Sequence, residues 1–181
     1  MRKLAVAALT SLAAFCAHAQ LSIEITGAGA NRIPIAIAPF ASEAALPVPA
    51  PGGTVSVTAI VRADLERSGL FRTLELPPLV PQPTESSSVN FAEWKARLAD
   101  ALVVGSIAAR PDGRFEVRFR LYDVVKQAAV AGVAYTVSKE QLRATAHRIA
   151  DTIYEKLTGE KGVFSTRIAY VVKRGARFEL Q

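Results

Sequence analysis

The stretch from Asp100 to Ser138 constrains the fold most, because three apolar runs follow one another with only short breaks. The first two runs flank Pro111-Asp112-Gly113, which is typical of a tight turn between paired strands. In Phe115–Leu121 large apolar residues alternate with Glu and Arg, as in a strand with one buried and one solvated face. Ala101–Ile107 is apolar on both faces and is expected at the centre of a sheet. The sequence therefore predicts a meander that forms the core.

Shorter patterns predict the other regular elements. Further strands are expected at Leu21–Thr26, Ile33–Phe40 and Leu70–Leu76. Helices are expected from a cap at Thr54 or Ser56 to Ser68, from Asn90 through Leu98, and from the Ser138/Gln141 capping box to about Thr158. Two prolines in Ile33–Phe40 place that strand either at an edge or with the prolines near its ends. The prediction is an α/β fold, α+β-like, with a mixed sheet of about five to six strands and two main helices packed on it.

Two proline-rich segments and the tail complete the chain. Residues 41–53 and about 77–89 are predicted to be loops, because proline and glycine interrupt both helices and ladders. Val163–Val172 is strand-like, residues 173–176 form a turn, and Arg177–Leu180 opens another strand. Since a lone hairpin is at best marginally stable, this tail either docks on the domain or begins a further structure.

The amino terminus has the pattern of a secretory signal peptide over residues 1–19. Met1-Arg2-Lys3 is basic, Leu4–Phe15 is apolar, and an A-x-A motif ends at Ala19, which predicts cleavage between Ala19 and Gln20. Cleavage would remove the single cysteine and lower the formal charge from +6 to +4. No later run reaches the roughly 18–20 apolar residues of a membrane span. We expect an exported, periplasmic protein without a membrane span.

Few residues could carry chemistry. His147 is the one histidine left after cleavage and lies one position off an apolar helix stripe, so a boundary position is favoured over catalysis or metal binding. No metal-ligand cluster, nucleophile elbow or phosphate loop is present, so we expect no enzyme activity, cofactor or metal. The basic side chains Arg110, Arg114, Arg118 and Arg120 form either a solvated strand face or a site for anionic envelope lipid or glycan. Nucleic acid is not expected, because no aromatic residues share that face.

Five stretches in order resemble the amino-terminal domain of the TolB family, the periplasmic component of the Tol-Pal system. They are Leu21–Thr26, Ile33–Phe40, Ile60–Phe71, Asp100–Asp123 with its Val-Val-Gly, Pro-Asp-Gly and Leu-Tyr-Asp motifs, and Ala146–Val172 with Tyr-Glu-Lys-Leu-Thr-Gly-Glu-Lys-Gly-Val-Phe-Ser-Thr-Arg-Ile-Ala-Tyr-Val. The last block is the most specific of the five. Together the blocks span nearly the whole predicted mature chain, from Leu21 to Val172.

The resemblance implies a non-enzymatic adaptor that contributes to outer-membrane integrity and to outer-membrane invagination at cell division. In this family the mature amino terminus binds the inner-membrane protein TolA. Carried over, the TolA-binding residues are Gln20, Leu21, Ser22, Ile23, Glu24, Ile25 and Thr26. An extended segment with alternating apolar residues can pair with an exposed sheet edge of a partner. The alternative is an ordinary edge strand of this domain.

The resemblance also implies a β-propeller after the α/β domain, and the propeller binds the lipoprotein Pal and is used by some colicins in protein import. The expected organisation is residues 20–162 as the amino-terminal domain and 163–181 as a linker and truncated start of the propeller. A propeller needs several four-stranded blades, which this chain does not contain. We therefore expect a fragment, and binding of Pal by this chain is in doubt.

Overall fold

The computed structural model describes residues 32–78, 83–85, 88–166, 169, 171–175 and 177–180. The strands are β1 (Ile33–Ile37), β2 (Val48–Ala50), β3 (Gly53–Val55), β4 (Phe71–Thr73), β5 (Ala101–Ala109), β6 (Phe115–Asp123), β7 (Ala128–Val137), β8 (Val171–Arg174) and β9 (Arg177–Leu180). The helices are α2 (Val57–Arg67), α3 (Phe91–Ala96) and α4 (Leu142–Thr158), with 3-10 turns η2 (Glu43–Ala45) and η3 (Lys139–Gln141). The predicted strand at Leu21–Thr26 lies outside the described residues.

The main sheet has five strands in the order β4-β1-β5-β6-β7. β1 runs parallel to both β4 and β5, whereas β5, β6 and β7 form the predicted antiparallel meander. The predicted α/β class and the central place of β5 are confirmed. β1 is also internal, and it fulfils the second expectation for its prolines, because Pro34 is its second residue and Pro39 follows its end.

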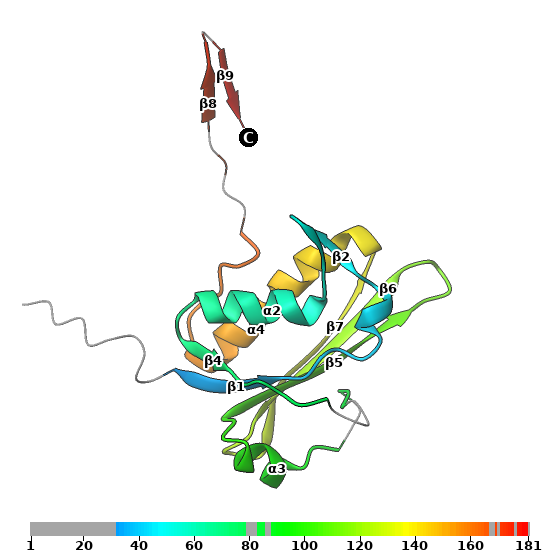
Figure 1. Ribbon diagram of the computed structural model, residues 1–181, viewed down its shortest axis with the longest axis vertical. Coiled ribbons are helices and arrows are strands. Elements are labelled where there is room, and N and C mark those ends of the chain that lie inside the picture. Colours follow the sequence, from blue (N-terminus) through cyan, green and yellow to red (C-terminus); the bar gives the residue numbers. More distant parts are fainter. Residues whose placement is uncertain are drawn as a thin grey trace, which may run out of the picture.

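Helices α2 and α4 cover one face of the sheet and form the larger core with it (Figure 1). Alternate residues of β1, β5 and β6 point to this face, among them Ile35, Val103 and Phe119, which are at most 1% exposed. The predicted helix stripes are the buried ones, from Val57 to Leu65 in α2 and from Leu142 to Ile153 in α4. The apolar periodicity of the sequence thus identifies the contacting faces correctly.

The opposite face is closed over only part of its width. There α3 packs Trp94 against side chains of β1, β5 and the end of β6, including Leu102, Val104 and Tyr122. In Figure 1 α3 lies on the side of the sheet away from α2 and α4. The apolar character of Ala101–Ile107 on both faces follows from this, because β5 contributes to both cores.

The helix termini follow the predicted capping patterns. Ser56, one of the two expected caps, accepts the Ala59 N–H at 3.1 Å, and Asn90 caps α3 through the Glu93 N–H. Both halves of the Ser138/Gln141 capping box are present before α4. These side chains satisfy backbone donors that the first turn of a helix leaves without partners.

Two expectations about irregular segments are wrong. Residues 41–53 form η2, β2 and the start of β3. β2 can pair with β3 because Pro47, Pro49 and Pro51 occupy alternate positions. The N–H groups that these prolines lack would all point to the side of the strand away from β3. Pro51-Gly52 forms the turn, with φ +86° at Gly52. In the tail, the described residues 161–166 form a turn and no strand, and the hairpin consists of β8 and β9, apart from the sheet in Figure 1.

Candidate interaction surfaces

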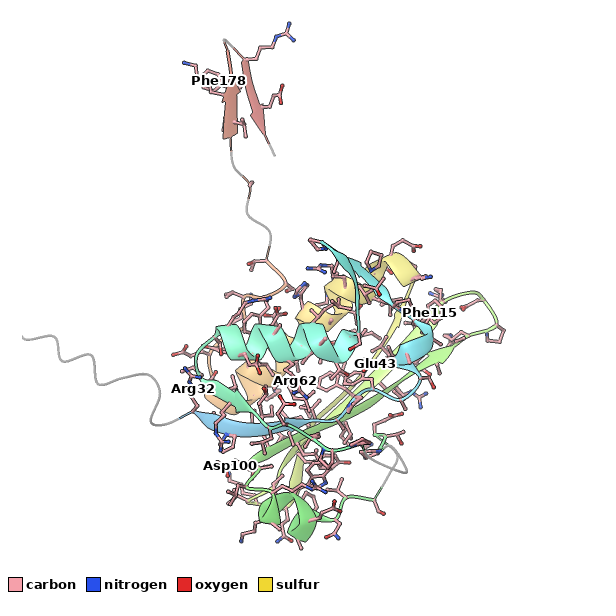
Figure 2. All side chains as sticks on the ribbon, in the orientation of Figure 1. Arg32, Glu43, Arg62, Asp100, Phe115 and Phe178 are labelled. Atoms are coloured by element: carbon pink, nitrogen blue, oxygen red, sulfur yellow. The ribbon has the colours of Figure 1, made fainter. Side chains whose placement is uncertain are left out.

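The chain enters the sheet at the start of β1, where the Ile33 N–H donates to the Leu70 carbonyl at 2.8 Å. Arg32 directly precedes this point (Figure 2). β4 and β5 pair with the two sides of β1, so the described sheet has no gap beside it. The predicted partner segment, Gln20–Thr26, and the predicted cleavage bond after Ala19 lie outside the described residues. The contacts of Gln20–Thr26 with a partner therefore remain a prediction.

The structure breaks up the predicted basic face. Arg110 and Arg114 lie at the β5–β6 turn. There the Asp112 carboxylate forms a salt bridge with Arg114 at 2.8 Å and lies 3.9 Å from the Arg110 guanidinium group. The Arg114 hydrogen bonds lower the pKa of Asp112 below its ordinary value. On β6, Arg118 pairs with Glu116 at 2.8 Å and lies 4.0 Å from Glu85. Three of the four predicted arginines thus hold carboxylates of this chain.

Arg120 differs from the other three. Its side chain is exposed and makes no ion pair or hydrogen bond with any residue in the described part of the chain. A hollow of about 250 Å³ lies beside it, and the residues that line it are Glu85, Arg118, Phe119, Arg120, Gly132, Val133 and Ala134. Glu85 is fixed there by Ser106, whose hydroxyl donates to it at 2.8 Å. The loop between β4 and α3 therefore borders the arginine face.

His147 is a boundary residue, as expected. It joins α4 to α2, since its Nδ1 lies 2.5 Å from Oδ2 of Asp64, whose carboxylate is nearly buried. The other carboxylate oxygen accepts from Arg67 at 3.1 Å. A groove of about 210 Å³ next to this pair is lined by alanines, Pro51, Val55, Ile60 and three basic side chains, Arg67, Arg143 and His147. It contains no hydroxyl or thiol that His147 could activate.

Glu43 is a second buried carboxylate on the helix side of the sheet. It lies beside the start of α2 (Figure 2), and one carboxylate oxygen accepts the Thr58 N–H at 2.9 Å. Thr58 in turn accepts the Phe40 N–H through its hydroxyl at 2.9 Å. Burial raises the pKa of Glu43 above its ordinary value, although these hydrogen bonds act in the opposite direction. These hydrogen bonds tie the segment that follows β1 to the first turn of α2.

The chain leaves the domain through a turn fixed to α4. Asp151 accepts the N–H groups of Phe164 and Ser165 at 2.6 and 3.1 Å. A Cβ at Gly162 would lie 2.5 Å from the Asp151 Cα, so the turn needs glycine there to come this close. Phe164 contacts Tyr154 edge to face at 5.7 Å between ring centroids. The course of residues 162–166 is therefore set by α4.

Sequence reasoning missed the groups that come together only through the fold. Glu43, Asp64, Glu85 and Asp151 are single acidic residues. Each has a partner that lies 13 to 83 positions away in the sequence. Gly162 lies in the most specific block of the family resemblance, but its sequence does not indicate the close approach to α4. Within the described ranges there is no cluster of three or more possible metal ligands, and none of the helices is long and apolar enough to cross a membrane.

Comparison with known proteins agrees with the observed fold. The family model of the TolB amino-terminal domain matches residues 21–130. The Tol-Pal system protein TolB of Dechloromonas aromatica is 56% identical over 180 residues, which are 99% of this chain and 40% of that protein. TolB of Nitrosomonas europaea is 54% identical over 164 residues, 91% of this chain and 36% of that protein.

A solved structure gives the same result. The crystal structure of TolB from Acinetobacter baumannii superimposes with a TM-score of 0.65 and 34% identity, and it covers 83% of this chain and 35% of that one. The chain spans about two fifths of the length of the curated relatives it matches. Since the family model matches more than half of the chain and the mixed sheet agrees with it, the chain belongs to the TolB family, in the part that forms its amino-terminal domain.

Proposed function

We propose that this chain is the partner-binding amino-terminal domain of a periplasmic Tol-Pal adaptor, and that its mature amino terminus, Gln20–Thr26, binds a TolA-type protein. Family membership carries this proposal, because TolB is a non-enzymatic component of the Tol-Pal system. Through that contact the protein contributes to outer-membrane integrity and to invagination of the outer membrane at division. The expectation of a non-enzymatic protein agrees with the family.

The position of β1 supports the choice of the amino-terminal segment. β1 is the first strand of the described sheet, and both of its sides are already paired. Residues before Arg32 are therefore not needed to fill the interior of the sheet. Leu21, Ile23 and Ile25 alternate with polar residues, which is the pattern of a strand that buries one face. Such a segment can add to the sheet edge of a partner.

The proposed domain organisation follows from the same reasoning. Residues 1–19 act as the signal peptide, residues 20–162 form the partner-binding domain, and residues 163–181 connect it to a propeller. The end of α4 at Thr158 and the turn that follows it at Gly162 support a boundary in this region. Pal binding is not proposed for this chain.

Binding to the isolated carboxy-terminal domain of TolA tests the proposal. The chain from Gln20 is compared with one that lacks Gln20–Thr26 and with the double variant Ile23→Asn, Ile25→Asn, by isothermal titration calorimetry. We expect the deletion and the double variant to abolish measurable binding. The control variant Ser22→Ala, Thr26→Ala changes the polar side of the segment and should bind as the unaltered chain does. Equal binding by all four proteins would refute the assignment.

A further inference from the structure

The outer edge of the sheet at β7 lacks the usual protection of an edge strand. β7 has ten residues, Ala128–Val137, with no charged residue and no proline among them. β6 pairs with one side of it, and no described strand pairs with the other. Natural edge strands usually avoid pairing with other chains by being short or by carrying lysine, proline or a bulge along the edge. The single irregularity of β7 lies near its start, opposite Leu121 and Tyr122, so most of the edge is regular.

The sheet face next to this edge is shaped by two small residues. Gly132 and Ala134 lie opposite Arg120 and Arg118 of β6, on the side of the sheet away from α2 and α4. A Cβ at Gly132 would lie 3.6 Å from Nε of Arg120, so the arginine side chain extends over the position where a larger residue would stand. The hollow of about 250 Å³ is lined by these small residues and by Val133 between them, so it reaches the edge strand β7.

The charges of the hollow select an anionic occupant. Arg118 is compensated by Glu116 and Glu85, whereas Arg120 has no acidic partner in the described part of the chain. A strand added to β7 would lie about 4.8 Å beyond it, so its side chains on this face would stand beside Gly132 and Ala134, and a long one can reach across these small residues. An acidic side chain in that position meets the guanidinium group of Arg120, and a basic one is repelled.

We propose that β7 is a docking edge for an extended segment of a protein partner that carries one acidic side chain. The segment pairs with β7 through its backbone, and its carboxylate lies in the hollow and binds Arg120. On the other side of the added strand, apolar side chains extend the larger core beside Val133 and Tyr135, which are only half-buried. The partner segment therefore alternates apolar and polar residues around its acid.

This surface is separate from the proposed TolA-binding segment, because it consists of residues of β6 and β7. Deleting Gln20–Thr26 removes the proposed TolA-binding segment and leaves the β7 edge intact, so each proposal can fail without the other.

A peptide of chosen composition tests the docking edge. The probe is a short acetylated and amidated peptide of alternating Val and Thr with one central Glu, and the matched control peptide has Lys in place of Glu. Both are titrated into the ¹⁵N-labelled chain from Gln20. We expect saturable shifts of the β7 amide signals with the Glu peptide, and affinity lower by about tenfold or more with the Lys peptide.

A charge swap makes the test specific. Arg120→Glu should reverse the preference, so that the Lys peptide binds and the Glu peptide does not. Arg148→Glu, on the exposed side of α4, makes the same charge change elsewhere and should leave the preference unaltered. Unchanged thermal unfolding of both variants confirms that the fold is intact. Equal affinity for the two peptides, or a preference that Arg120→Glu does not reverse, would overturn the proposal.

Hydrogen exchange distinguishes other occupants of the edge. In the free protein every second amide of β7 should exchange rapidly and become protected when the Glu peptide is added. Protection that is already present at every protein concentration means that the chain's own residues cover the edge. Protection that rises with protein concentration means that a second copy does. Either result refutes docking of a separate partner segment.

Discussion

The two faces of the main sheet differ in how completely they are closed, and β6 belongs to both. On the face covered by α2 and α4, its residues Val117, Phe119 and Leu121 are at most 1% exposed. On the other face Arg118 and Arg120 are exposed, because α3 covers β1, β5 and only the end of β6. Two long helices are enough to close a five-stranded sheet on one side, and one short helix is not. The uncovered part is where this domain can offer a binding surface.

The helix-covered face also contains the buried polar groups. Among the described residues the buried polar or charged side chains are Glu43, Thr58, Asp64 and Thr145, and all belong to η2, α2 or α4. Each has a hydrogen-bond partner, as buried polar groups in native proteins do. On the open face the charged groups instead pair with one another in solvent. Substitutions should therefore have large effects on the first face and small ones on the second.

The largest effect is expected from Phe119→Ala, which leaves a cavity between the sheet and the helices. Loss of a buried Phe side chain costs about 3–5 kcal/mol in free energy of unfolding. Arg118→Ala, one residue away on the open face, removes exposed ion pairs and should cost less than about 1 kcal/mol. Urea unfolding followed by circular dichroism measures both. Similar losses for the two variants would show that the faces are equally closed.

Two glycines provide a sharper version of the same comparison. Gly105 is on the helix-covered side, where a Cβ would lie 2.6 Å from the Arg118 carbonyl and 2.7 Å from Cε2 of Phe40. We expect Gly105→Ala to lower the free energy of unfolding by about 1–3 kcal/mol through overpacking.

Gly132→Ala is the matched control on the open face. Its Cβ would make only ordinary contacts, the nearest at 3.6 Å, and alanine reduces the entropy lost on folding. This variant should be neutral or more stable by up to about 1 kcal/mol. A large loss from Gly132→Ala would contradict the open hollow beside Arg120.

The buried Glu43 should make stability depend on pH. Because its pKa is raised in the folded protein, the folded state holds a proton in the range between the ordinary value of 4.5 and the raised one, where the unfolded chain has lost it. This contribution is fully present below 4.5 and decreases as pH rises through the folded pKa. Relative to the unaltered protein, the free energy of unfolding of Glu43→Gln should therefore increase as pH rises above 4.5.

Urea unfolding of the two proteins at several pH values measures that difference. Glu75→Gln removes an exposed carboxylate and serves as the control with no such trend. If the difference in free energy of unfolding between Glu43→Gln and the unaltered protein is the same at every pH, the pKa of Glu43 is not raised by folding.

The smallest effect concerns the alternative function, binding of anionic envelope lipid or glycan by the basic face. Because Arg110, Arg114 and Arg118 already hold carboxylates, charge reversal of Arg114 and Arg118 together should leave co-sedimentation with phosphatidylglycerol vesicles unchanged. The chain with both residues intact is the reference, and phosphatidylcholine vesicles are the control surface. Loss of vesicle binding on charge reversal would support the lipid alternative and place function on the open face.

Features that depend on short, repeating sequence patterns could be predicted from the sequence. Alternation in Phe115–Leu121 gave the two faces of β6, and the spacing of serine, asparagine and glutamine gave the helix caps. It could not predict which helix covers which face, because Ala101–Ile107 is apolar on both. It also misjudged the prolines of 47–51, since a loop and an edge hairpin have the same composition. The contacts of Arg118 with Glu85 and of Asp64 with His147 join distant segments, which no local pattern encodes.

The order of strands has a consequence for how the domain can form. β1 is made first, yet it lies between β4 and β5, and Ile35 pairs with Ala101. A chain that appears amino terminus first, on a ribosome or through a translocation channel, cannot complete this sheet before Ala101–Ala109 has emerged. Until then the Ile-rich β1 lacks one neighbour and could pair with other chains. The early part of the chain is therefore the part most in need of a chaperone.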